Sequence, residues 1–139
     1  PITRYLVLKQ VGWADGTGYI LDGASVNQML LVQRTLSPNI NIYAGSYLSN
    51  NSNLAIGSYG VVVAIYNGVS SSLVVNDTAA ITGDAGAGTS DGITIGKSGG
   101  AGAFYGNIQV KELVLRNVAD SAATQAQIRA LLKSLHGTP

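Results

Sequence analysis

Short apolar runs separated by Gly, Asn, Ser or Asp recur about every 10 to 15 residues along most of this chain, a pattern typical of strands joined by turns. In residues 40–45, Ile40, Ile42 and Ala44 fall on one face of a strand. The continuous apolar run at residues 60–66 indicates a strand buried on both faces. The predicted strands are Thr3–Val11, Tyr19–Asp22, Gln28–Arg34, Ile40–Ala44, Tyr59–Asn67, Ser72–Asn76, Ala79–Thr82, Ile93–Gly96 and Gly106–Asn117.

The last of these strands changes phase in its middle. Ile108 and Val110 alternate with polar residues, and Leu113 and Leu115 continue the alternation one position out of step. A β-bulge near Lys111 and Glu112 would return all four apolar side chains to one face. We therefore expect a bulge in this strand.

Residues 121–136 carry the only helical pattern of the sequence. Their apolar positions follow the i, i+3, i+4, i+7 spacing of one helix face, and these are Ile128, Leu131, Leu132 and Leu135. Asp120 or Ser121 can cap the first turn, and Gly137 can end the helix in the left-handed conformation. We expect this helix to lie across a sheet face or edge.

One helix beside many strands with glycine-rich turns predicts an all-β fold, either a sandwich or a barrel. A chain of 139 residues is long enough to bury one substantial core. We therefore predict a single domain over residues 1–139, with strands at about 3–117 and the closing helix at about 121–136.

Charged residues are scarce in this sequence, at 11% of the chain, and the net charge is +1. The sequence also has no cysteine. Without clustered Lys or Arg we expect no nucleic-acid partner. Without a long apolar run we expect no membrane span. A weakly charged surface fits two alternatives, a face covered in a larger assembly or a neutral soluble module coated with Ser, Thr and Asn.

The residues that carry most enzyme chemistry are also few. His136 is the only histidine and Glu112 the only glutamate, and the six aspartates all lie at predicted turns or strand ends. A nucleophile needs a nearby base, and glycoside hydrolysis needs paired carboxylates. Gly96-Lys97-Ser98 lacks the spacing and the following helix of a phosphate-binding loop. We therefore expect no catalytic residues and no enzyme.

Calcium is the one cofactor that the turn aspartates leave open, because it binds carboxylate and carbonyl oxygens of loops. Asp15, Asp84 or Asp91 could donate, although the sequence has no D-x-D-x-D-G loop. Hydrogen bonds of these side chains to their own turns are the favoured alternative.

Aromatic and amide side chains in loops are the candidates for ligand contact, because a flat ring covers the apolar face of a sugar while amides and carboxylates bond its hydroxyls. We expect the core to take Tyr66 and Phe104, and for the single Trp13 a core position is favoured over a ligand site. The candidate glycan-contacting residues are Trp13, Asp15, Tyr19, Tyr47, Asn50, Asn51, Asn53 and Tyr105.

The order of motifs from residue 61 onward resembles the laminin-G-like, concanavalin A-like jelly-roll domains of bacterial secreted and phage virion proteins. The matching residues are Asn67-Gly68, Val75-Asn76, Ile95-Gly96, Phe104, Gly106 and Ile108. The resemblance covers about residues 18–137 and implies two packed antiparallel sheets that bind rather than catalyse. It also implies a further strand ahead of residues 3–11, so that either the sheet is shorter here or a neighbouring chain supplies its edge.

Taken with the sequence patterns, the resemblance implies a non-catalytic jelly-roll protein that lies on a virion surface or outside the cell. The first hypothesis is a structural subunit, such as a phage capsid decoration or tail-associated protein, that is a homo-oligomer or part of a larger virion assembly and adheres to glycans. The alternative is a carbohydrate-binding module of a tail fibre or of a secreted polysaccharide-active enzyme.

Overall fold

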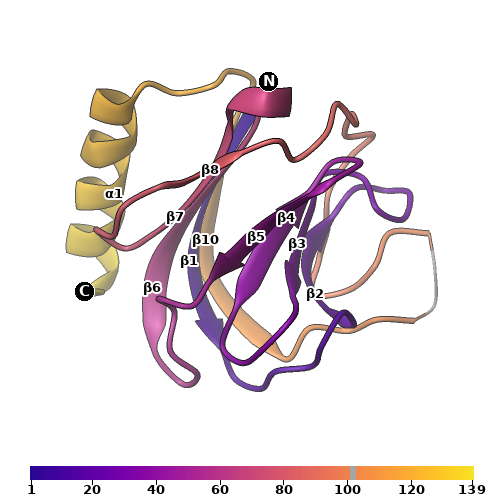
Figure 1. The fold of residues 1–139 in the computed structure, drawn as a ribbon. Helices are drawn as coiled ribbons and strands as arrows, with labels where there is room; N and C mark the ends of the chain where they lie inside the picture. Colours follow the sequence, from indigo (N-terminus) through magenta and orange to yellow (C-terminus); the bar gives the residue numbers. More distant parts are fainter. Residues whose placement is uncertain (101–102) are drawn as a thin grey trace.

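The computed structural model describes residues 1–100 and 103–139, without the side chains of residues 49 and 50, and has two antiparallel sheets packed face to face (Figure 1). Sheet A is five-stranded, in the order β10 (Ile108–Arg116), β1 (Ile2–Gln10), β6 (Tyr59–Tyr66), β7 (Ser71–Val75) and β8 (Ile81–Gly83). Sheet B is also five-stranded, in the order β5 (Tyr47–Asn51), β4 (Ile40–Tyr43), β3 (Leu30–Gln33), β2 (Gly18–Asp22) and β9 (Thr94–Ile95). A short 3₁₀ helix, η1 (Gly68–Ser70), joins β6 to β7, and the chain ends in α1 (Ala122–His136). This architecture confirms the all-β, two-sheet antiparallel sandwich with one short C-terminal helix.

The main core lies between the sheets and follows the alternation of the strands. Ile40, Ile42 and Ala44 all belong to it, as the sequence predicts. Strand β6 is buried on both faces because Val62 and Ala64 enter this core while Val61 and Val63 enter a second cluster on the outer face of sheet A. The continuous apolar run of β6 is therefore explained by cover on both sides.

The predicted bulge is present in β10. Its pairing with β1 runs from Thr3 opposite Arg116 to Val7 opposite Glu112, and then steps to Leu8 opposite Val110. Lys111 is the extra residue. Ile108, Val110 and Leu113 consequently all pack against the main core.

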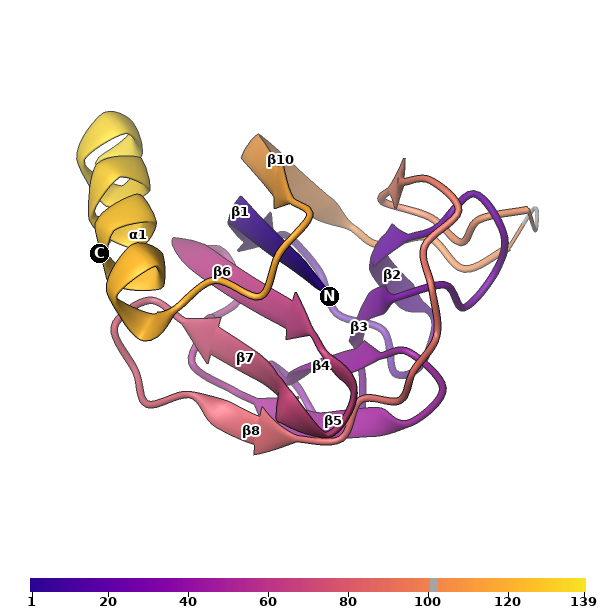
Figure 2. The ribbon, with the colours of Figure 1, turned by 90° about the horizontal axis from the view of Figure 1, so that it is seen from above.

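Helix α1 covers the outer face of sheet A (Figures 1 and 2). Leu132 is buried against Tyr5 and the outward residues of β6, with Ile128 packed beside it. Ser121 is the N-cap, accepting from the backbone N–H of Thr124 at 3.2 Å, and Gly137 ends the helix with φ of 61°. Leu131 and Leu135 of the predicted stripe remain exposed.

Replacing Ser121 by alanine should lower the free energy of unfolding by about 1 kcal/mol, because the N–H of Thr124 would lose its acceptor. Urea denaturation followed by circular dichroism measures this change. Ser134→Ala, an exposed site in the same helix, is the control and should leave the midpoint unchanged. Equal midpoints for both variants would contradict a capping role.

The sandwich is closed along one edge and open along the other. At the β5 and β8 edge, Ala85 accepts from the backbone N–H groups of Ala44 and Ser46 at 2.6 and 3.0 Å, which ties the two sheets together. At the opposite edge β10 and β9 close only at one end, where Gly106 N–H donates to Gly96 at 2.9 Å. Core side chains are therefore only half-buried along β10.

Two sequence expectations fail. Residues 47–51 form strand β5 rather than a loop, because Tyr47 pairs opposite Tyr43 of β4 although its own segment lacks apolar alternation. Phe104 is not a core residue, since it is 41% exposed and its φ is 66°. Tyr66, in contrast, is buried as expected, at 1% exposure.

Candidate functional site

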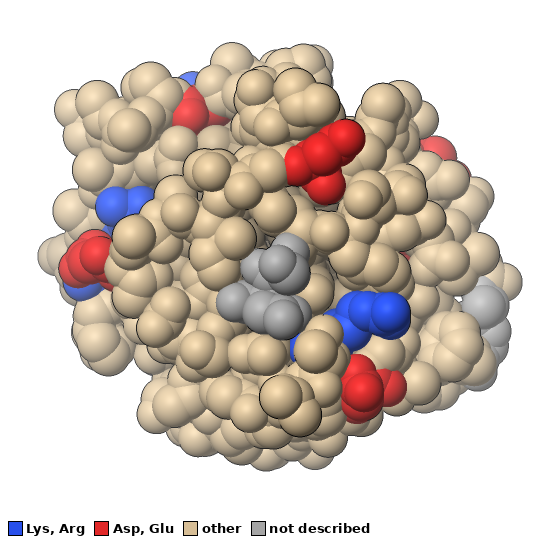
Figure 3. Space-filling model, in the orientation of Figure 1, with Lys and Arg blue, Asp and Glu red and all other residues tan. Residues whose placement is uncertain are grey.

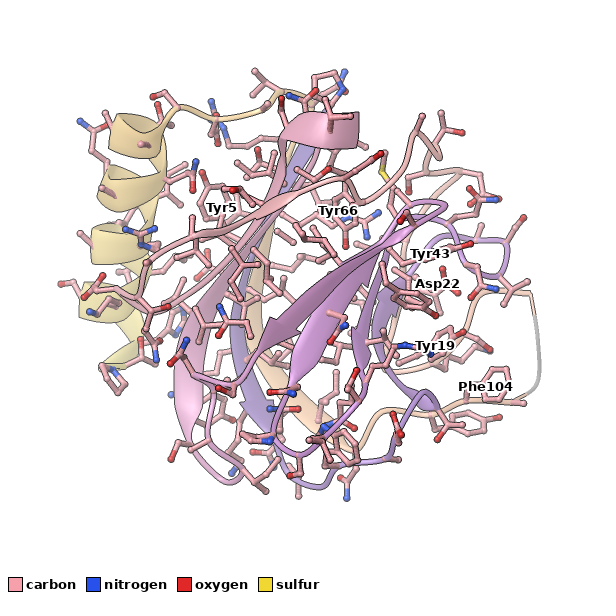
Figure 4. All side chains as sticks on the ribbon, viewed as in Figure 1. Tyr5, Tyr19, Asp22, Tyr43, Tyr66 and Phe104 are labelled. Atoms are coloured by element: carbon pink, nitrogen blue, oxygen red, sulfur yellow. The ribbon has the colours of Figure 1, made fainter. Side chains whose placement is uncertain are left out.

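Four aromatic side chains gather on the face of sheet B that points away from sheet A. They are Tyr19 of β2, Tyr43 of β4, Tyr47 of β5 and Phe104 of the segment before β10, and we call them the aromatic face. Figure 4 shows Tyr43, Tyr19 and Phe104 following one another down this side of the molecule. The main core takes Ile42 of β4 and Leu48 of β5, so alternation sends Tyr43 and Tyr47 outward. Tyr19 lies beside Ile20 of the core in the same way, whereas Phe104 belongs to no strand and reaches this face by stacking on Tyr19.

The four rings form two contacting pairs. Tyr19 and Phe104 stack with centroids 5.3 Å apart and an interplanar angle of 21°. Tyr43 and Tyr47 are cross-strand neighbours with centroids 4.6 Å apart. Tyr47 is 39% exposed and Phe104 41%, whereas Tyr19 is only 5% exposed. Tyr47 and Phe104 therefore offer the accessible ring surface, and Tyr19 supports it from below.

Arg34 adds a cation to the aromatic face. Its guanidinium carbon lies 4.1 Å from the centroid of the Tyr47 ring, a cation–π contact that holds both side chains in place. Arg34 also lines a polar hollow of about 400 Å³ together with Asp15, Gly16 and Thr35. This hollow, the Asp15–Arg34 hollow, places hydrogen-bonding groups of both charges directly beside an exposed ring.

A buried amide lies on the same side of sheet B. Asn41 falls on the outward side of β4, since Ile40 and Ile42 on either side point into the main core. The residue is 2% exposed, and its Oδ1 has no hydrogen-bond partner. A buried acceptor without a donor costs free energy, and because this oxygen is enclosed it adds no surface for a ligand to touch.

Asp22 and Asn27 hold the aromatic face in position. The Tyr19 hydroxyl donates to Asn27 Oδ1 at 2.8 Å, and Asn27 N–H donates to Asp22 Oδ2 at 3.0 Å. Burial raises the pKa of Tyr19, so this hydroxyl remains a donor. Asp22 Oδ2 also accepts from Gly99 N–H at 3.0 Å, which anchors the segment that leads to Phe104.

The structure brings together Asp15, Tyr19 and Tyr47 from among the residues proposed on sequence grounds. Trp13 is half-buried and donates from Nε1 to the Asn39 carbonyl at 3.1 Å. Asn51 is fully buried and its Oδ1 accepts from Asn53, so neither Asn51 nor Asn53 joins the aromatic face.

Two further proposed residues lie elsewhere or outside the described part. Tyr105 is 63% exposed and its backbone pairs with Lys97. The side chain of Asn50 lies outside the described residues.

Sequence reasoning missed Tyr43, Arg34 and Asn41. For the two residues of β4 a signal was present, because placing Ile40 and Ile42 in the core sends Asn41 and Tyr43 to the opposite face. Arg34 carries no such signal, since it follows β3 and meets Tyr47 only through the order of strands in sheet B.

The turn aspartates considered for calcium each bind backbone N–H groups. Asp15 accepts from Thr35, Asp84 from Gly86, and Asp91 from Ala24 and Ser25, with distances of 2.7 to 3.2 Å. Within residues 1–100 and 103–139, no three His, Cys, Asp or Glu side chains group as metal ligands. Only Asp84 therefore bonds within its own turn. Asp15 and Asp91 each accept from a loop far away in the sequence, which the sequence did not predict.

His136 and Glu112 form a pair that the sequence did not suggest, with 2.5 Å between Nε2 and Oε2. It joins the end of α1 to β10.

Charged residues are sparse and scattered on the face seen in Figure 3. Within the described part of the chain, α1 is the only α-helix, and it is too short and too polar to span a membrane.

Comparison with protein-family models, with curated proteins and with solved structures found no match to this chain. The likeness to laminin-G-like domains consequently stays an expectation from sequence motifs, and the function has to be argued from the aromatic face itself.

Proposed function

We propose that this chain is a non-catalytic binding module whose aromatic face holds a glycan. The observation that carries the proposal is the accessible ring of Tyr47, which contacts Arg34 of the Asp15–Arg34 hollow, together with the accessible ring of Phe104 on the same face of sheet B. A sugar presents an apolar C–H face that packs on an aromatic ring and a rim of hydroxyls that needs donors and acceptors. Rings and polar groups of this kind occur together here on one sheet face.

The preformed contacts of this face favour binding. Arg34 over Tyr47 and Phe104 on Tyr19 fix the rings before any ligand arrives, so less conformational entropy is lost on binding. The spread of rings over several strands fits an extended oligosaccharide better than a single sugar. No charge block accompanies it, which favours a neutral glycan.

The setting that we propose is a virion surface or an extracellular protein, in which the module adheres to glycans. A structural subunit of such an assembly is the second candidate, and one observation favours it, the open edge of the sandwich along β10. The two functions use different surfaces, the outer face of sheet B and the edge of sheet A at β10, and are compatible.

Replacing Tyr47 by alanine should weaken glycan binding at least about tenfold, because the variant loses the exposed ring and the cation–π contact that positions Arg34. A glycan array identifies the ligand, and isothermal titration calorimetry with the best oligosaccharide gives Kd. Phe104→Ala should have a comparable effect. Tyr59→Ala is the matched control, since this tyrosine lies on the outer face of sheet A and should leave Kd unchanged.

Absence of any glycan signal for the folded wild-type chain would overturn the proposal. If binding occurs but responds to Trp13→Ala and not to Tyr47→Ala, a glycan site exists elsewhere and the aromatic face is not that site.

A further inference from the structure

Strand β10 is the outer strand of sheet A, and within the described residues no strand pairs with its free side (Figure 2). The free side of an edge strand presents unpaired N–H and C=O groups that can bind another strand. Residues of β10 also line two mainly apolar clefts. One cleft, of about 400 Å³, is bounded by Ile2 and Ile93 as well, and the other, of about 490 Å³, by Ile95. Both the backbone and the core of the sandwich are therefore accessible at this edge.

The bulge gives β10 a two-fold symmetric pattern. Inward-facing residues are Ile108 and Val110 before the bulge, and Leu113 and Leu115 after it. Without a bulge, residues of one parity would face one way along the whole strand. Because Lys111 is inserted, the two halves have opposite parity, and the pattern becomes the same when read from either end of residues 108–115.

Opposed residues in an antiparallel pair point to the same face. If two copies of β10 meet about an axis between Lys111 and Glu112, then Val110 opposes Leu113 and Ile108 opposes Leu115 on the inward face. On the outward face Lys111 of each copy opposes Glu112 of the other, and this contact would add to the pair of Glu112 with His136 within each copy. A single register thus matches apolar with apolar side chains and each cation with an anion.

We propose that β10 binds β10 of a second copy of this chain in this register, which joins two copies of sheet A into one continuous sheet. A two-fold contact of this kind is isologous and closes on itself, so it gives a dimer rather than a fibre. A Lys and a bulge often prevent edge strands from pairing. Here the bulge and Lys111 allow one antiparallel register in which β10 of one copy is complementary to β10 of the other. The net charge of +1 adds little repulsion between copies.

Helix α1 supports the choice of a second copy. Arg129 and Lys133 pair with Asp77 beyond β7, so the opposite flank of the helix faces the β10 side of sheet A. That flank carries Leu131 and Leu135, which are 57% and 62% exposed. In the proposed dimer these leucines lie on the side of each helix that faces the two-fold axis.

The test is sedimentation velocity on the 139-residue chain and on two charge variants over a range of concentrations. Wild type should associate reversibly to a dimer. Lys111→Glu and Glu112→Lys should each weaken dimerisation about tenfold or more, since each places like charges opposite one another twice. An equimolar mixture of the two variants should regain a heterodimer of wild-type strength, because every opposed pair is again of unlike charge.

Asp84→Lys is the matched control, because it changes the net charge as Glu112→Lys does on an exposed residue beyond β8, at the opposite edge of sheet A, and it should leave dimerisation unchanged. Thermal unfolding of each variant checks that the fold is intact. A monomeric wild type at all concentrations would overturn the inference, as would a dimer that neither charge variant weakens. Failure of the mixture to recover would exclude this register. None of these results depends on glycan binding, which is measured separately.

Discussion

Replacing Asp22 by alanine should lower the free energy of unfolding by roughly 3–5 kcal/mol, a large fraction of the total for a domain of this size. The Asp22 carboxylate is fully buried at the end of β2 and accepts four backbone N–H groups. Oδ1 accepts from Gly23 and Gln28, and Oδ2 from Asn27 and Gly99, at 2.8 to 3.0 Å. Alanine would leave all four donors without this acceptor, and those of Gly23 and Gly99 are buried.

The loss should spread to the aromatic face. Asp22 positions Asn27, which accepts the Tyr19 hydroxyl, and it anchors Gly99 on the segment that carries Phe104. Urea denaturation measures the stability, and Kd for the glycan measures the effect on binding. Asp22→Asn should lose most of what Asp22→Ala loses. The amide nitrogen of asparagine is a donor, so it would face two backbone N–H donors and could not accept from them.

Asp91 provides the matched control. It accepts from Ala24 and Ser25 of the same loop, but it is exposed, so water replaces it when Asp91→Ala removes the carboxylate. This variant should lose far less stability than Asp22→Ala. Similar losses for the two variants would contradict the claim that burial of the carboxylate, rather than the loop contact, determines the effect.

The contrast between Asp22 and Asp91 shows where sequence reasoning stops. All six aspartates occupy turns or strand ends, and the local sequence does not distinguish a buried carboxylate from an exposed one. Asp22 is buried because Gly99, 77 positions away, brings its N–H to the same carboxylate. Such convergence is a property of the sheet order and not of any short segment.

Local periodicity predicted most of the strands, the bulge and the helix because each is set within a few residues. The change in apolar alternation between Val110 and Leu113 is visible in the sequence, and both residues can face the core only if one extra residue, a bulge, lies between them. Strand β5 escaped prediction because its edge position pairs it with β4 alone, and polar residues suffice there. Phe104 was assigned to the core on residue type, yet its positive φ turns the ring onto Tyr19 outside sheet B.

Alkaline pH should destabilise the protein strongly, with the free energy of unfolding falling between pH 10 and pH 12. Burial raises the pKa of Tyr66 from 10.0 to about 12, although Arg4, 5.0 Å from its ring centroid, partly opposes the shift. Burial also raises the pKa of Tyr5, with a further contribution from its hydrogen bond to Asp120 at 2.7 Å. Both hydroxyls therefore stay protonated in the folded protein at a pH where they ionise in the unfolded chain.

The sign follows from proton binding. Above pH 10 the unfolded state binds fewer protons than the folded state, so stability decreases as pH rises, by about 1.4 kcal/mol per pH unit for each such group. The stabilisation from Tyr66 is complete below pH 10 and is lost as the pH passes through about 12. Over this window Tyr66 alone accounts for about 2–3 kcal/mol, and Tyr5 adds to it in the same direction.

Tyr66→Phe separates this effect from the general loss of lysine charge at high pH. At pH 7 the variant should be less stable by about 1 kcal/mol, because the Leu30 carbonyl loses the hydroxyl that donates to it at 3.0 Å. Between pH 10 and pH 12, however, its stability should fall less steeply than that of the wild type, since phenylalanine has no proton to release. Urea midpoints measured across this range would contradict the assignment if the two curves ran parallel, because the fall in stability would then come from groups other than the buried Tyr66.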